Sequence, residues 1–261
     1  MNRTRFGLVS LLSVAALAVA AQPAAAQASV TAELINGLNE RLLYIAIPIT
    51  ILVEGILLYT VLRFKDNEEA SPTKENRKLE ITWTVATAVV LLFVGVASYG
   101  VLANENVTFQ GGDEQVAPQE NDVLVQVEAY QWGWRMSYPQ ENVQLSSASP
   151  TIVVPEGQDV YFRITSADVL HAFAVPEMGL KQDAIPEQNN TIKTVPTEQG
   201  VYQGYCTEYC GVAHSNMYFE VEVVSQSEYQ DFIANQQSQQ SDSDDSTASD
   251  LEAADAEALA A

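Results

Sequence analysis

LLYIAIPITILVEGILLYTVL, residues 42–62, is an apolar stretch of 21 residues that decides the first half of the fold. A second stretch, ITWTVATAVVLLFVGVASYGVLA at 81–103, is 23 residues long and carries no charge. A helix needs about 20 apolar residues to cross a bilayer, and the buried helix of a soluble core is usually shorter. The two stretches predict a hairpin of membrane-spanning helices at about 42–62 and 81–103.

The connection between the apolar stretches is rich in basic residues. It reads RFKDNEEASPTKENRK (63–78) and holds five of the chain's twelve Lys and Arg residues, namely Arg63, Lys65, Lys74, Arg77 and Lys78. By the positive-inside rule, such a loop stays on the cytoplasmic side of the membrane. We therefore expect both ends of the mature chain, and all that follows residue 103, to be extracytoplasmic.

The first 28 residues have the organisation of an export signal. Arg3 and Arg5 precede an apolar core, FGLVSLLSVAALAVAA (6–21), and the small residues AQA at 26–28 fit a cleavage site. We predict cleavage before Ser29 and a location in the plasma membrane, with residues 29–103 as the N-terminal segment and hairpin. An uncleaved N-terminal anchor is the alternative.

The chain is strongly acidic, with a formal net charge of -22 over 261 residues. Such a surface cannot neutralise a phosphate backbone, which argues against nucleic acid as a partner. Dense carboxylates hold water and suit a halophilic protein that works in concentrated salt. They also suit the docking of a basic partner, so both interpretations remain open.

Residues 121–228 change to short alternating runs that are typical of β-strands. Rich in Val, Ile, Tyr and Phe, the runs are VLVQVEAY, QWGWRMSY, TIVVP, DVYFRIT, TIKTVP, GVYQGYC and MYFEVEVV. Strands at this spacing, separated by turn residues, predict a β-sandwich or a small barrel. We expect residues 104–120 to form a linker and the Ser-, Gln- and Asp-rich residues 229–261 to form a disordered acidic tail.

Four soft donors lie within GYCTEYCGVAHSNM (204–217): Cys206, Cys210, His214 and Met217. They include both cysteines of the chain and one of its two histidines; the other, His171, lies near the end of an earlier strand. A structural disulfide is the ordinary use of two cysteines in an exported domain. A bridge across so short a loop adds comparatively little stability, however, and gives no reason for His and Met to follow.

This set of two thiolates, two imidazoles and a thioether favours copper over magnesium or calcium, which prefer oxygen ligands. Zinc has no use for a methionine. A single blue-copper site needs one cysteine, two histidines and a weak methionine, so the second cysteine predicts a second copper ion, with both thiolates bridging the pair. One electron spread over two ions in a stiff β-frame suits fast electron transfer.

Two segments, ADVLHAFAVPEMGLKQDAIP (167–186) and YCTEYCGVAHSNM (205–217), resemble subunit II of haem-copper cytochrome c oxidases, with its dinuclear copper A centre. The resemblance covers about residues 38–225. It implies a two-helix transmembrane hairpin followed by an extracytoplasmic all-β cupredoxin domain, which is a Greek-key β-sandwich or barrel.

The resemblance also implies how the metal is held. Cys206 and Cys210 would bridge two copper ions. One ion would take His171 and Met217, and the other would take His214 and the backbone carbonyl of Glu208. The side chain of Glu208 would face subunit I, where the family binds a magnesium or manganese ion.

The aromatic segment AYQWGWRMSYP (129–139) is similar to the one in which the family accepts electrons, and Trp132 matches the accepting residue. On its own, the alternation of Tyr130, Trp132, Trp134 and Met136 indicates one buried face of a strand. The segment departs from the family pattern at Tyr130, where the family often has His, and at Gly133, where it often has an aromatic residue. The identity of the donor therefore stays open.

The segment KLEITW (78–83) opens the second apolar stretch. Glu80 and Trp83 match a family pattern in which the glutamate is the entrance of a proton-uptake channel that continues in subunit I. By itself, a carboxylate at this position is favoured by the helix dipole, which is a purely structural role.

The sequence thus predicts subunit II of a respiratory haem-copper terminal oxidase. Electrons from a cytochrome c or a small blue-copper protein would pass through the copper pair to haem in subunit I, where oxygen is reduced to water and protons are translocated. Other oxidase subunits would be further partners. Two alternatives are a quinol oxidase subunit II, which lacks the copper ligands, and a membrane-anchored, disulfide-stapled binding domain without a redox role.

Overall fold

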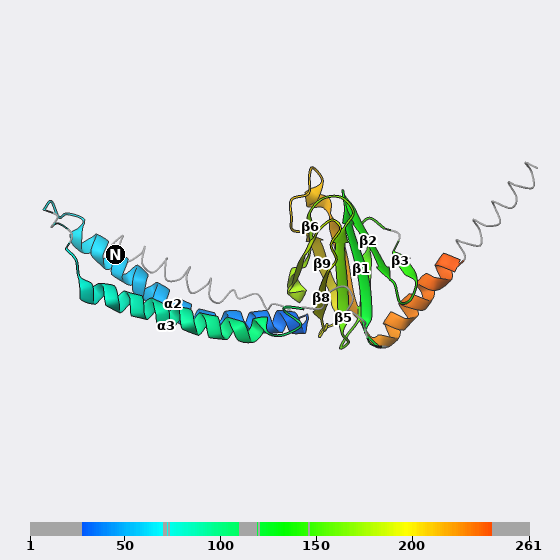
Figure 1. Cartoon of the computed structure of the whole chain (residues 1–261), viewed down its shortest axis with the longest axis horizontal. Coiled ribbons are helices and arrows are strands. Elements are labelled where there is room, and N and C mark those ends of the chain that lie inside the picture. The colour runs from blue at the N-terminus through cyan, green and yellow to red at the C-terminus, as the bar shows by residue number, and fades with distance from the viewer. Residues whose placement is uncertain are drawn as a thin grey trace, which may run out of the picture.

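The computed structural model describes most of the chain between residues 28 and 241. The described ranges are 28–69, 72, 74–109, 119, 121–145 and 147–241. The predicted export signal, apart from Ala28, lies outside them, as does the predicted acidic tail beyond residue 241. Within these ranges a helical hairpin leads into a β-domain, which is followed by a C-terminal helix (Figure 1).

Two long helices, α2 (Val30–Phe64) and α3 (Arg77–Leu102), lie side by side and extend away from the β-domain (Figure 1). Their most apolar windows have mean hydropathies of 2.2 and 2.3, and almost no side chain in those windows is buried. This confirms the predicted hairpin. The predicted start at residue 42 is wrong as a helix boundary, because α2 already begins at Val30, where the side chain of Ser29 caps it.

The β-domain consists of two five-stranded sheets, with the strand orders β3-β2-β1-β5-β8 and β4-β10-β9-β6-β7. The strands are β1 (Val123–Tyr130), β2 (Gly133–Tyr138), β3 (Val143–Leu145), β4 (Thr151–Pro155), β5 (Val160–Ser166), β6 (His171–Val175), β7 (Leu180–Ala184), β8 (Asn190–Thr194), β9 (Gly200–Cys206) and β10 (Tyr218–Val224). β1 pairs in parallel with β5, and β10 with β4; the remaining pairs are antiparallel. The predicted all-β sandwich is confirmed.

Aromatic side chains fill the centre of the space between the sheets. Phe173 of β6 stacks on Phe219 of β10 with ring centroids 4.7 Å apart, and Trp134 of β2 packs edge-on against both. Gly204 makes room for this cluster, because a Cβ at that position would collide with the Phe219 ring. Since Phe173 is paired with Cys206 across β6 and β9, the cluster forms a rigid floor under the predicted metal ligands.

The C-terminal helix occupies residues 226–241. The prediction that the tail is disordered from residue 229 is therefore wrong for 229–241. Tyr229 and Phe232 pack edge-on against Tyr138, and Ile233 joins the buried core. Spacings of three and four residues place these three side chains on one face of a helix, which the acidic average composition of the tail conceals.

Residues 104–109 of the predicted linker lie outside the helices and strands, and they contact the β-domain. Lys193 of β8 donates to the carboxylate of Glu105 at 2.9 Å and lies 3.0 Å from that of Asp159. Burial of the ammonium group lowers the pKa of Lys193, but the two hydrogen bonds outweigh it and the net shift is upward. The remaining residues of the predicted linker, apart from Gln119, lie outside the described ranges.

Candidate metal centre

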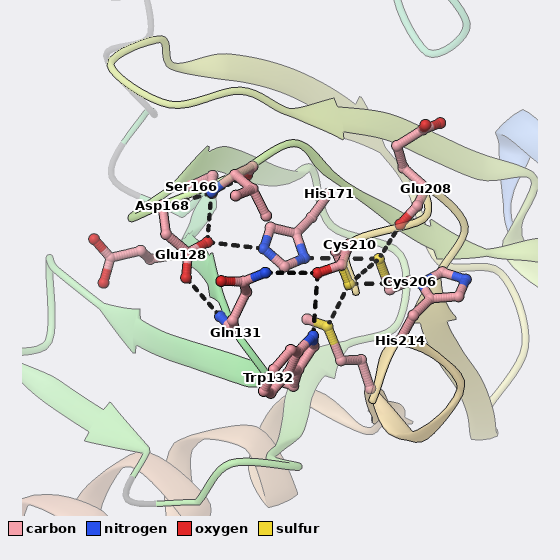
Figure 2. Close-up of polar contacts among 12 residues, drawn as sticks. Glu128, Gln131, Trp132, Ser166, Asp168, His171, Cys206, Glu208, Cys210 and His214 are labelled. Carbon is pink, nitrogen blue, oxygen red and sulfur yellow. Dashed lines mark hydrogen bonds and ion pairs between the residues drawn. The ribbon is translucent and has the colours of Figure 1, made fainter. Parts of the chain in front are cut away.

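Two strands and one loop bring the five predicted side-chain donors together. Figure 2 labels four of them, His171, Cys206, Cys210 and His214. His171 begins β6, Cys206 ends β9, and Cys210, His214 and Met217 lie on the loop that leads through the short helix η2 (His214–Asn216) to β10. The antiparallel pairing of β6 with β9 sets Cys206 opposite Phe173, two residues along β6 from His171. The remote histidine and the local Cys-x3-Cys-x3-His-x2-Met motif therefore meet in three dimensions.

The donor atoms of this cluster face one another. The two Sγ atoms of Cys206 and Cys210 are 4.0 Å apart, and both cysteines are free. His171 Nδ1 lies 3.8 Å from Cys206 Sγ, and His214 Nδ1 lies 3.5 Å from Cys210 Sγ. Met217 Sδ is 3.3 Å from Cys210 Sγ. Both cysteines are free, and His171, Cys206 and Cys210 lie close enough together to hold a metal ion.

The chemistry of the site suits a soft cation. Cys206, Cys210, Met217 and His171 are all buried. Burial, and then the neighbouring Cys206, raises the pKa of Cys210 to about 12. Two thiolates this close need a cation that offsets their charges, and copper ions meet this need with the donor types present.

A backbone oxygen also lies next to the cluster. The backbone carbonyl oxygen of Glu208 lies 3.2 Å from Cys206 Sγ. Its carboxylate points away from the two sulfurs, as Figure 2 shows. The main chain of Glu208 thus faces the cluster, whereas its side chain does not.

Asp168, which sequence reasoning missed, orients His171. Its carboxylate lies 3.0 Å from His171 Nε2, which leaves Nδ1 free to face Cys206. Burial opposes ionisation of Asp168, but hydrogen bonds from His171 and from the backbone N–H groups of Gln131 and Val169 outweigh it and lower its pKa. A carboxylate that holds the second nitrogen of a ligand histidine is a recurrent feature of metal sites. The spacing Asp-x2-His was the only sequence signal for it.

Gln131 and Trp132 connect the cluster to the surface. Gln131 Nε2 donates to the Cys210 carbonyl at 2.7 Å, and Trp132 Nε1 donates to the same oxygen at 3.1 Å (Figure 2). Gly211 lies directly beneath the indole, because a Cβ there would be 3.0 Å from Trp132 Cζ2. Its φ of +122° is also a backbone conformation that other residues rarely adopt. The role of Gln131 was not foreseen from the sequence.

The predicted strand face at this segment is wrong for Trp132. Trp134 and Met136 are buried on β2, at 0% and 2% exposure, whereas Trp132 lies in the turn between β1 and β2 and is 38% exposed. The turn ends the alternation, because residues 131 and 132 lie outside both strands. The indole of Trp132 is therefore partly exposed to solvent, while its N–H donates a hydrogen bond to the carbonyl of Cys210.

Glu80 is not part of this cluster. It lies in the first turn of α3, at the end of the hairpin far from the β-domain (Figure 1). Its side chain and that of Trp83 are exposed. The two site regions predicted from the sequence are thus separated by the length of the hairpin.

Comparison with known proteins identifies the family. The family model described as the periplasmic domain of cytochrome c oxidase subunit II matches residues 137–224, and the one described as its transmembrane domain matches residues 17–101. A probable cytochrome c oxidase subunit 2 from Rickettsia bellii is 32% identical over 227 residues, which is 79% of this chain and 81% of the relative. Cytochrome c oxidase subunit 2 from Cereibacter sphaeroides is 32% identical over 239 residues, 77% and 76% of the two chains.

Among solved structures, the periplasmic domain of subunit II of the cytochrome oxidase of Bradyrhizobium japonicum is similar at 28% identity and a TM-score of 0.42, over 45% of this chain and 94% of that one. The two family matches and the relatives agree with the hairpin, the β-sandwich and the His and Cys cluster described above. The chain is a membrane-anchored subunit of a haem-copper oxidase with a copper-binding β-domain, and it belongs to the cytochrome c oxidase subunit II family.

Proposed function

We propose that this chain accepts single electrons from an extracytoplasmic donor at two copper ions and passes them to haem in subunit I, where oxygen is reduced to water and protons are translocated. One observation carries the proposal: two free cysteines, two histidines and a methionine converge in one cluster. When bound, the copper pair supplies a one-electron couple that both ions share through the thiolates. A quinol oxidase subunit or a disulfide-stapled domain would not need this donor set.

Each predicted ligand has neighbours that support its role. Cys206 and Cys210 are proposed to bridge the ions, because each sulfur faces the other and a different histidine. As the family resemblance implies, one ion would take His171 and Met217, and the other would take His214 and the carbonyl of Glu208. Asp168 holds the ring of His171 with Nδ1 turned toward the sulfurs, so this ligand needs no reorientation when metal binds.

Trp132 is proposed as the residue at which electrons arrive. It is partly exposed, and its indole N–H is bonded to the carbonyl of Cys210, a proposed bridging ligand. One hydrogen bond and one residue thus separate the solvent-exposed ring from the thiolate. Gln131 bonds to the same carbonyl and keeps it in place. The donor would be a cytochrome c or a small blue-copper protein that docks around this turn.

Glu80 is proposed as the cytoplasmic entrance of a proton-uptake channel that continues in subunit I. It follows the basic loop 63–78, which the positive-inside rule keeps in the cytoplasm. The same rule puts the copper domain and both ends of the mature chain outside the plasma membrane. The carboxylate of Glu208, which points away from the sulfurs, is proposed to bind magnesium or manganese at the boundary with subunit I.

The metal content of the full-length chain tests this proposal. The chain is purified from membranes in detergent, loaded with copper, and analysed by metal counting and electron paramagnetic resonance. We expect two coppers per chain with one unpaired electron delocalised over both. Cys210→Ser should abolish this signal, whereas Ser215→Ala, which changes an exposed hydroxyl of the same loop, should keep it. One copper per chain, or a Cys206–Cys210 disulfide after loading, would refute the bridged pair.

A further inference from the structure

The first described residues of the chain form an edge of the β-domain. Ala28 and Ser29 are both 0% exposed. Ser29 forms an antiparallel bridge with Pro196, and two backbone hydrogen bonds of 3.0 Å flank it: Thr197 N–H to Ala28 O and Val30 N–H to Val195 O. Residues 28–30 therefore lie against 195–197 as an added piece of strand.

Side chains strengthen the same attachment. Ser29 Oγ donates to the Met178 carbonyl at 2.6 Å and accepts the N–H of Ala32 at 3.2 Å, so it both joins the β-domain and begins α2. Thr31 Oγ1 donates to the Asn106 carbonyl and shares a hydrogen bond with Thr194 Oγ1. We call residues 28–31 the N-terminal clasp. The Thr31–Thr194 hydrogen bond joins the start of α2 to strand β8, and the Glu105–Lys193 pair joins the segment after α3 to the same strand.

The clasp conflicts with cleavage of the export signal before Ser29. That cut would turn the Ser29 nitrogen into an α-amine with a pKa of about 8, largely charged at neutral pH. The new charge would lie on a residue that is fully buried when Ala28 precedes it, and whose hydroxyl bonds to two neutral backbone groups. It would also lie at the N-terminus of α2, where the helix dipole is already positive. The cut would further remove Ala28 from the core.

We propose that the signal is cut upstream of the clasp, after Ala26, so that the mature chain begins at Gln27. Residues 24–26 read AAA and supply the small side chains that a signal peptidase requires. The peptidase hydrolyses the Ala26–Gln27 bond with one water, which leaves a carboxylate on Ala26 and an α-amine on Gln27. The amine then lies two residues before Ser29 and the clasp stays whole.

Mass spectrometry of the N-terminal peptide tests the cleavage site. The whole gene is expressed in a host that exports and processes the chain, and the protein is purified from membranes. We expect the first residue to be Gln27. A mature chain that begins at Ser29 or later, or one that still begins at Met1, would overturn the proposal.

A pair of variants tests why the clasp must be retained. Deletion of Gln27 and Ala28 makes Ser29 the first residue after the same cut, and Gln27→Ser is the matched control with full length. We expect the deletion to lower the Tm of the full-length chain by about 5 °C or more, since each lost kcal/mol is worth about 2–4 °C at this size.

An equal Tm in the two chains, with Ser29 verified as the first residue, would overturn the role of the clasp. Should the deletion variant not accumulate, Thr31→Val replaces it, with Thr82→Val as control, because the Thr82 hydroxyl bonds only to Lys78 within its own helix. A lower Tm for Thr31→Val supports the clasp, and an equal one overturns it.

Discussion

Lys193→Met removes the cation that joins the membrane hairpin to the β-domain. The Lys193 side chain is 8% exposed, and its ammonium group contacts the carboxylates of Glu105 at 2.9 Å and Asp159 at 3.0 Å. Methionine keeps most of the aliphatic stem but leaves the two carboxylates facing each other. The variant should therefore lose the attraction and gain repulsion at the same position.

The size of the loss follows from burial. Breaking a fully buried ion pair typically costs about 3–5 kcal/mol. The Glu105 and Asp159 side chains are 64% and 34% exposed, so water screens both charges. We therefore expect the free energy of unfolding to fall by about 1–2 kcal/mol. For a chain of this size that corresponds to a Tm lower by about 2–8 °C.

The assay is thermal unfolding of the full-length chain in detergent. Lys181→Met is the matched control, because it removes the same charge from an exposed position on β7. Adding Asp159→Asn to Lys193→Met should restore part of the loss, since it removes one unpaired carboxylate. A Tm for Lys193→Met within about 1 °C of the control, or no recovery in the double variant, would refute the reasoning.

The dependence on pH gives a second check of the same pair. The pKa of Lys193 is raised in the folded chain, so the stability it contributes is fully present below the unfolded pKa of about 10.4. Above that pH the contribution declines, and it is gone once the pH has passed the higher folded pKa. The stability gap between the wild-type chain and Lys193→Met should thus stay constant from about pH 6 to 10 and shrink above that range.

Four further outcomes are expected. Met217→Leu should keep both coppers but shift their reduction potential, measured by redox titration, because a weak axial thioether tunes a copper site more than it holds it. Trp132→Ala should cripple electron transfer from donor to copper at both low and about 1 M salt in stopped flow, since a Debye length of about 3 Å leaves only short-range contacts; a rate that survives would exclude this residue as the point of arrival. Glu80→Gln should slow steady-state oxygen consumption of the assembled oxidase while copper content stays unchanged, and unaltered turnover would return Glu80 to a structural role. Glu141→Gln should raise the Tm at pH 7, because burial raises the pKa of Glu141 and the folded state is penalised once the pH exceeds the unfolded pKa; a lower Tm would contradict this.

The part of the site that is local in sequence was predictable. Cys206, Cys210, His214 and Met217 are close in the chain, and the softness of their donor atoms is enough to indicate copper. His171 could be added because the chain has only two histidines. Asp168 was not predictable in the same way, because its role depends on which nitrogen of His171 faces the sulfurs, and that is fixed by the packing of β6 against β9.

The fold showed the same division between periodic patterns and tertiary contacts. The length of the two apolar stretches predicted the hairpin, and the alternation of apolar and polar residues predicted the strands of the sandwich. The alternation of residues gave a wrong burial for Trp132, because this residue lies in the turn between β1 and β2, where the two-residue period of the strands is interrupted. Composition gave a wrong prediction for 229–241, because contacts such as that of Tyr229 with Tyr138 order a segment whose average content is polar.

Helix α2 is longer than the membrane is thick. Its 35 residues extend over about 52 Å, against a hydrocarbon core of about 30 Å. Residues 30–41 precede the apolar stretch and carry Glu33, Glu40 and Arg41. In the proposed topology they would stand outside the lipid as a spacer of about 18 Å and would raise the copper domain clear of the headgroups. A soluble donor can approach it from the side, whereas a donor anchored in the same membrane would need a tether of at least about six extended residues to reach it.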